Sequence, residues 1–198
     1  DRVGIKPLYY AVLGSRLLFA SEPKAILRCP EVSREIDPTA LDAYLSLLYV
    51  PPPYSIYRGI RQLPPGHTLT WRAGEAQVRK YWDAEPCPDF SQTDDEWAEE
   101  IAPILEDSIR MRMMSDVPLG VFLSGGIDSS ALAAMASKMV DEPLRTFSVG
   151  FAEKEANELP YARLAAQHIG AQHREVLVTP GDFFGALPRL IWHEDEPI

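Results

Sequence analysis

The residues best suited to chemistry form one short stretch, the glycine loop SGGIDS (residues 124–129), which follows an apolar run and precedes a helical pattern. Two adjacent glycines let a backbone approach a ligand closely and adopt dihedral angles that side chains oppose. Successive backbone N–H groups and the start of a helix together attract an anion. Ser124 and Ser129 add hydroxyl donors. The glycine loop therefore predicts a site for phosphate or pyrophosphate.

A plainer interpretation is a turn from strand to helix, with Asp128 or Ser129 as the helix cap. The length of the motif and its position between a strand pattern and a helix pattern favour the anion site. The loop is not a Walker A loop, because it lacks the GK[ST] ending and its phosphate-binding lysine.

The elements that must position this loop alternate between strand and helix. Apolar stretches predict strands at 119–123, 145–151 and 173–178, and helical patterns cover 128–140, 158–170 and 180–193. This alternation is typical of parallel strands with right-handed crossovers. Ligands of such sheets lie beyond the carboxyl ends of the strands, where the glycine loop falls. An earlier helix at 94–114 contains Pro103, which predicts a kink or a late helix start.

The first part of the chain has a different pattern. Two hairpins are expected, around Gly14-Ser15 and around Ala73-Gly74, with a helix over 37–50 between them. The proline-rich stretch 51–71 could be a polyproline II ligand for an SH3-type partner. Its interleaved aromatic and aliphatic residues favour a packed, extended segment.

Composition excludes several classes of protein. The net charge of −10 disfavours binding to nucleic acid, and no apolar run has membrane-spanning length. Residues 1–86 carry 11 basic and 9 acidic residues, whereas residues 87–198 carry 8 and 20, which indicates two units. The only cysteines, Cys29 and Cys87, form no CxxC pair. With no signal peptide at the start, we expect a cytoplasmic protein with free thiols, and its ends look cut from a longer chain.

The glycine loop resembles the pyrophosphate-binding loop of the N-type ATP pyrophosphatases, which cleave ATP between the α- and β-phosphates. Its surroundings resemble the glutamine-hydrolysing asparagine synthetases over nearly the whole chain. The stretches that carry this resemblance are "RMMSDVPLGVFLSGGIDSS", "TFSVGF", "NELPYARLAAQHIG", "DEP", "DRVGIKPLYY", "FASEPKAIL" and "YVPPPYSIYRGIRQLPPGHTLTW".

The resemblance implies an α+β part followed by an α/β part. Residues 1–86 would be the C-terminal part of an N-terminal-nucleophile-type glutaminase domain, 87–94 a linker, and 95–198 the first part of a Rossmann-like parallel-sheet ATP pyrophosphatase domain. The implied reaction forms β-aspartyl-AMP from aspartate and ATP, and ammonia from glutamine then displaces AMP. It implies aspartate, glutamine and ATP as small-molecule substrates, Mg²⁺ as a cofactor, no nucleic-acid or membrane partner, and a homodimer at full length.

The resemblance also assigns residues. For ATP and pyrophosphate these are Phe122 or Leu123, Ser124, Gly125, Gly126, Asp128, Ser129 and Val149. Asp1 would recognise the α-amino group of glutamine. Glu158 would face Mg²⁺, with Asn157 competing for that position, and Asp195 and Glu196 match the "DEP" segment. No catalytic residue is expected within the chain, because the nucleophilic cysteine of the family would lie outside it and the fragment alone would be inactive.

Other readings stay open. A close relative could act on another acceptor, as a β-lactam-forming synthetase or as an amidotransferase for a peptide or a polysaccharide. The chain could also be a non-catalytic nucleotide-binding module. A sulfur-transfer or tRNA-modifying pyrophosphatase is disfavoured by the acidic balance and the absence of paired cysteines.

Overall fold

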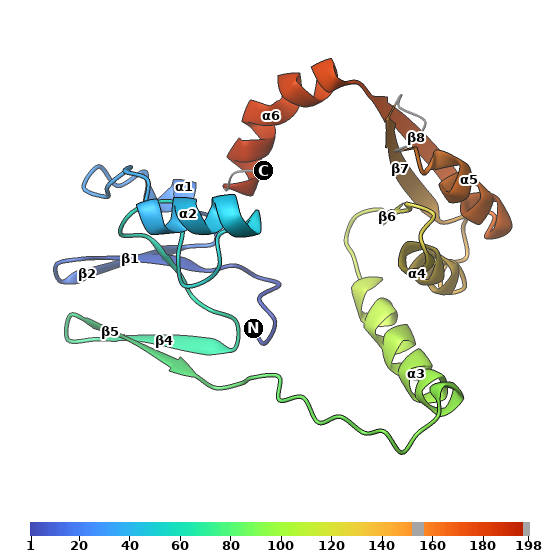
Figure 1. The fold of residues 1–198 in the computed structure, drawn as a ribbon, viewed down its shortest axis with the longest axis horizontal. Coiled ribbons are helices and arrows are strands. Elements are labelled where there is room, and N and C mark those ends of the chain that lie inside the picture. The colour runs from blue at the N-terminus through green and yellow to red at the C-terminus, as the bar shows by residue number, and fades with distance from the viewer. Residues whose placement is uncertain (152–156, 196–198) are drawn as a thin grey trace. The chain divides into compact units, whose positions relative to one another are not determined.

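The computed structural model describes residues 1–151 and 157–195 (Figure 1). The chain forms two compact units. One contains Asp1–Cys87 and the residues from Ala186 on, and the other contains Pro88–Gly185. The division into family domains at 1–86, 87–94 and 95–198 stays a prediction.

The first unit is built on antiparallel strands. Three of them form a sheet in the order β2-β1-β3: β1 (Tyr9–Leu13), β2 (Arg16–Ala20) and β3 (Arg61–Gln62). Strands β4 (His67–Arg72) and β5 (Glu75–Lys80) form a separate hairpin. At its turn both Ala73 and Gly74 have positive φ, as a two-residue turn of type I′ requires. Both predicted hairpins are therefore confirmed.

Two helices complete the first unit, α1 (Pro23–Ile26) and α2 (Pro38–Leu47). The side chain of Asp37 caps α2 by accepting hydrogen bonds from the N–H groups of Thr39 and Ala40. Ile56 and Ile60, from the proline-rich stretch, are buried in the core. This stretch is packed, as its aromatic and aliphatic residues predicted. Residues 51–60 form turns and not the extended segment that was expected, with the N–H of Tyr54 bonded to the carbonyl of Pro51 and the N–H of Ile60 bonded to the carbonyl of Tyr57.

The second unit alternates strands and helices, apart from its opening helix. Its elements are α3 (Asp94–Arg112), β6 (Val121–Phe122), α4 (Ile127–Ser137), β7 (Arg145–Phe151), α5 (Leu159–His168), β8 (Gln172–Val178) and the first part of α6 (Pro180–Glu194). The three strands are parallel, in the order β6-β7-β8. The predicted mixed α/β architecture with a parallel sheet is confirmed.

Helix α3 does not start late. Thr93 accepts from the N–H of Glu96 while the carboxylate of Glu96 accepts from the N–H of Thr93, which is a capping box. These two bonds start the helix at Asp94, and it continues through Pro103. The alternative of a late start was wrong because the cap outweighs the single hydrogen bond that proline removes.

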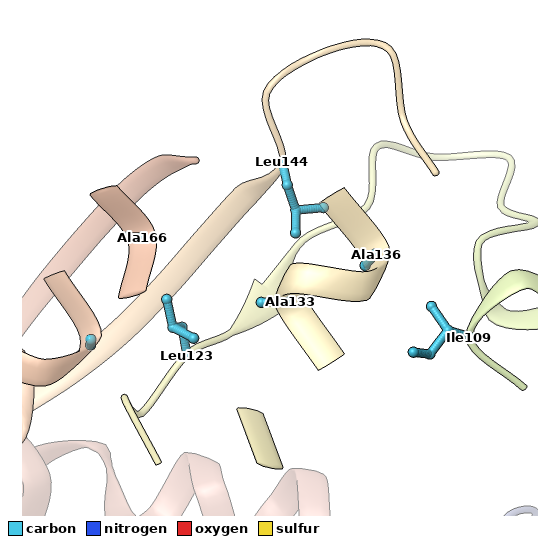
Figure 2. Close-up of a cluster of buried hydrophobic side chains, with 7 residues drawn as sticks. Ile109, Leu123, Ala133, Ala136, Leu144 and Ala166 are labelled. Carbon is cyan, nitrogen blue, oxygen red and sulfur yellow. The ribbon is translucent and has the colours of Figure 1, made fainter. Parts of the chain in front are cut away.

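The core of the second unit surrounds the end of β6 (Figure 2). Leu123 is 1% exposed and packs with Ala133 and Ala136 of α4 and with Ala162 and Ala166 of α5. Alanine side chains let both helices approach the strand closely, so the apolar contact is dense. This packing fixes the point from which the glycine loop begins.

A polar network ties α5 to the sheet. The guanidinium of Arg163 donates to both carboxylate oxygens of Glu175, at 3.0 and 2.7 Å. The hydroxyl of Thr146 is 2.9 Å from Nδ1 of His173, whose other ring nitrogen lies 3.5 Å from the same carboxylate. The Arg163 guanidinium is the main cause that holds the pKa of the Glu175 carboxyl below its ordinary value.

Within the described ranges, no helix combines the length and the apolar character needed to span a membrane.

Candidate functional site

The two glycines of the loop have different conformations. Gly125 has a φ of +84°, in the left-handed region that favours glycine. Gly126 is the N-cap of α4, with an extended backbone at φ −70° and ψ 163°, which other residues adopt without strain. Of the two unusual conformations that the sequence suggested, only that of Gly125 is present.

Hydroxyl groups join the two ends of the loop. The hydroxyls of Ser124 and Ser129 are 2.9 Å apart, and the Ser129 hydroxyl accepts from the backbone N–H of Ser124 at 3.3 Å. The Ser124 hydroxyl accepts from the N–H of Gly126, also at 3.3 Å. The loop is thus closed by its own serines.

No side chain caps the start of α4. The Ser129 hydroxyl donates back to the carbonyl of Gly126 instead, and Asp128 lies exposed in the first turn. Neither Asp128 nor Ser129 therefore caps α4, so that part of the plainer interpretation is wrong, while the anion site itself stays a prediction. The first-turn N–H groups, which have no partner inside a helix, stay open to an anion.

Leu123 is held from both sides just before the loop. Its N–H donates to the carbonyl of Phe147 at 2.8 Å, and its carbonyl accepts a hydrogen bond from the hydroxyl of Ser148. Ser148 is only 5% exposed. Sequence reasoning missed this serine, although a single polar residue inside the apolar strand "TFSVGF" was the available signal.

A pocket of about 350 Å³ opens at this end of the sheet. Its lining comes from three separate segments: Phe122, Leu123, Ser124 and Ser129; Phe147, Ser148 and Val149; and Glu158, Leu159 and Ala162. Six residues predicted for the site thus meet around one pocket.

The candidates for adenosine differ in exposure. Phe122 is 79% exposed and Val149 is 52% exposed, so both offer apolar surface to a ligand. Leu123 reaches the pocket too, but its side chain belongs to the core. Gly125, Gly126 and Asp128 are not among the pocket's lining residues.

Asn157 and Glu158, the two candidates for the Mg²⁺ position, make different contacts. The side-chain oxygen of Asn157 accepts from the N–H of Leu159 at 3.0 Å, so Asn157 fastens the start of α5. Glu158 makes no cap bond, is exposed, and lines the pocket. A free carboxylate beside a phosphate-type loop is the donor chemistry that Mg²⁺ prefers.

Asp1 lies in the first unit. One carboxylate oxygen accepts from the N–H groups of Val3, Gly4 and Ile5, and the other accepts from the N–H of Lys6 at 2.9 Å. The carboxylate thus organises the turn that follows it. Its predicted role towards the α-amino group of glutamine stays a prediction.

Among the residues that the structure describes, the remaining candidates form no second site. Asp195 is paired with Lys24, and Glu196 lies outside the described residues. Cys29 is partly buried near Glu31, and Cys87 is exposed. The part of the chain that the structure describes holds no group of three or more His, Cys, Asp or Glu residues that could bind a metal.

Comparison with known proteins adds to this geometry. A family model described as asparagine synthase matches residues 100–198, which is half of the chain, and one described as glutamine amidotransferase domain matches residues 1–82. The chain belongs to the asparagine synthase family. The glycine loop and the pocket both lie within the part that matches the asparagine synthase family.

Individual relatives agree with this assignment. The glutamine-hydrolyzing asparagine synthetase 1 of Bacillus subtilis is 35% identical over 199 residues, covering 100% of this chain and 31% of its own length. A relative from Methanocaldococcus jannaschii is 36% identical over 202 residues, covering 100% of this chain and 39% of the relative. The amidase chyE of Penicillium rubens is 29% identical over 216 residues, covering 100% of this chain and 32% of the amidase. The chain thus spans about a third of the length of these relatives.

Proposed function

We propose that the protein containing this chain is a glutamine-hydrolysing carbon–nitrogen ligase that converts aspartate to asparagine. ATP would react with the β-carboxylate of aspartate to give β-aspartyl-AMP and pyrophosphate. Ammonia released from glutamine would then displace AMP. The observation that carries the proposal is the pocket of about 350 Å³ in which the glycine loop, the end of β7 and Glu158 meet.

The glycine loop is suited to hold the β,γ-pyrophosphate of ATP. The uncapped first turn of α4 supplies N–H groups, and Ser124 and Ser129 supply hydroxyls. Charge accumulates on the leaving pyrophosphate as the α-phosphate is attacked, and fixed donors stabilise that charge. Phe122 and Val149 would bind the adenosine part through their exposed apolar surface.

Mg²⁺ would be held by Glu158 together with phosphate oxygens of ATP. Once bound, it would neutralise part of the phosphate charge. Asp128, exposed in the first turn of α4, is available to organise the loop or the ion's water shell.

The glutamine half-reaction would need residues beyond those described. Asp1 would meet the α-ammonium of glutamine. Neither Cys29 nor Cys87 lies in a stretch that resembles the nucleophile motif of the family, so the 198 residues alone should release no ammonia from glutamine. A cytoplasmic homodimer without nucleic-acid or membrane partners stays a prediction.

The test uses the full-length protein with ATP, aspartate and an ammonium salt. We expect AMP, pyrophosphate and asparagine in equal amounts, and omission of aspartate should abolish all three. Release of ADP and phosphate in place of AMP and pyrophosphate would contradict the proposal.

A second candidate is an amide-forming relative with another acceptor, because the relative from Penicillium rubens bears the name amidase. This candidate predicts AMP and pyrophosphate only when a carboxylate other than aspartate is supplied. A panel of amino-acid and peptide carboxylates in the same assay separates the two.

A further inference from the structure

The ammonium of Lys24 contacts the C-terminal end of α6, and both partners lie within the first unit. Its ammonium donates to the backbone carbonyl of Trp192 at 2.9 Å and to the carboxylate of Asp195 at 2.7 Å. It also lies 3.1 Å from the carboxylate of Glu22. A lysine ammonium has three donors, so these three acceptors use them all.

The ion pair is shielded from water. The side chains of Lys24 and Asp195 are 18% and 9% exposed, whereas both partners of the Arg58–Glu35 pair in the same unit are more than half exposed. Trp192 adds to the shielding, because its ring centroid lies 5.5 Å from the Lys24 ammonium. A partly buried pair loses more when one partner is removed, since the remaining charge keeps its burial without its counterion.

The contacts stabilise the end of a helix. The last carbonyls of any α-helix lack partners inside the helix and carry negative potential. Lys24 supplies both a donor and a positive charge to that end of α6. Asp195, the residue that follows α6, has a φ of +61°, which an L residue adopts only at some cost. Lys24 is therefore placed to stabilise this helix end.

The two sides of this contact match different family models. Lys24 lies in the range that matches the glutamine amidotransferase domain, and Trp192 and Asp195 lie in the range that matches asparagine synthase. We propose that Lys24 is a positioning residue that anchors the C-terminal end of α6 and keeps these two parts of the sequence engaged. Resting on the proposed function, we expect loss of the anchor to lower the share of glutamine-derived ammonia that is incorporated into asparagine.

The first test measures the anchor without any activity. Hydrogen–deuterium exchange of the full-length protein is compared among the parent, Lys24→Met and Arg58→Met, which removes a cation from the exposed pair. In Lys24→Met, amides near Trp192 should exchange about tenfold faster, because local opening becomes easier, and Arg58→Met should leave them unchanged. Equal exchange in the parent and Lys24→Met would overturn the anchor.

The second test measures coupling, as asparagine formed per glutamate released when glutamine is the nitrogen source. In folded Lys24→Met this ratio should fall by about half or more, while synthesis from an ammonium salt stays within about twofold of the parent. Asp195→Asn should act in the same direction, and Arg58→Met should not. An unchanged ratio, or an equal loss with both nitrogen sources, would overturn the coupling. A parent protein that makes no asparagine from either source would refute the proposed function and the coupling with it, while the exchange result still decides the anchor.

Discussion

The backbone of Gly125 lies directly against Ala162 at the start of α5. A Cβ placed on Gly125 would fall 2.5 Å from the backbone nitrogen of Ala162, closer than real Cβ contacts allow. At Gly126 the same construction meets only the hydroxyl of Ser124, at 3.3 Å. The first glycine is therefore required for packing, whereas a Cβ at the second would meet only one flexible side chain.

Alanine substitutions should separate these two roles. Gly125→Ala combines a positive φ with a backbone clash, and it should destabilise the fold by about 2–5 kcal/mol. Gly126→Ala should change stability by only about 1 kcal/mol and act on ATP, lowering pyrophosphate release roughly tenfold or more. Urea denaturation and the pyrophosphate assay check the two effects. Equal stabilities for both variants would contradict the assigned roles.

Carboxylate substitutions near the pocket should affect only the ATP half-reaction. Asp128→Ala and Glu158→Gln should each lower pyrophosphate release roughly tenfold to a hundredfold, as expected for loss of a charge-assisted contact worth about 1.5–3 kcal/mol. Glu158→Gln should also raise the Mg²⁺ concentration needed for half-maximal rate. Glutamine hydrolysis should survive in both, and Glu99→Gln, an exposed carboxylate on α3, is the matched control. If folded Glu158→Gln keeps the parent's Mg²⁺ dependence, Glu158 is not the metal ligand.

Removal of the buried hydroxyl of Ser148 should loosen the end of β6. Ser148→Ala leaves the carbonyl of Leu123 without this donor, which should cost about 1–3 kcal/mol of stability. Ser137→Ala is the control, because that hydroxyl only donates to a carbonyl within its own helix and its loss should cost less than about 0.5 kcal/mol. Urea denaturation curves of the parent, Ser148→Ala and Ser137→Ala provide the check. Equal losses of stability in the two variants would argue against a special role for Ser148.

The Arg163–Glu175 pair predicts a specific dependence of stability on pH. Because Arg163 lowers the pKa of Glu175 in the folded state, the pair stabilises the fold above the unfolded pKa of about 4.3 and loses this effect as pH falls through the folded pKa. Glu175→Gln should therefore be less stable than the parent at about pH 7, and the difference should shrink below about pH 4. Denaturation midpoints measured across this range provide the check, and a difference that stays constant down to pH 2 would contradict it.

Local signals in the sequence were sufficient for the elements and the loop. The alternation of apolar strands with helical patterns predicted β6, β7 and β8 and the helices between them, because parallel strands are joined by helical crossovers. The Gly14-Ser15 and Ala73-Gly74 pairs predicted both hairpins through the φ angles that tight turns need. The late start of α3 that Pro103 suggested was wrong, because a capping box that begins ten residues earlier decides where the helix begins.

Within the candidate site, the sequence identified the candidate residues, whereas tertiary contacts decided which of them serve packing and which face the pocket. The sequence by itself singled out the glycines, serines and acids of residues 124–129 and Glu158. Only the folded chain shows that Gly125 packs against α5, that Asn157 bonds the N–H of Leu159 while Glu158 lines the pocket, and that the Ser148 hydroxyl donates to the carbonyl of Leu123. These assignments depend on contacts between segments more than 20 residues apart or on which side of a helix start a side chain faces. No local pattern encodes either, since both follow from how the strands and helices pack.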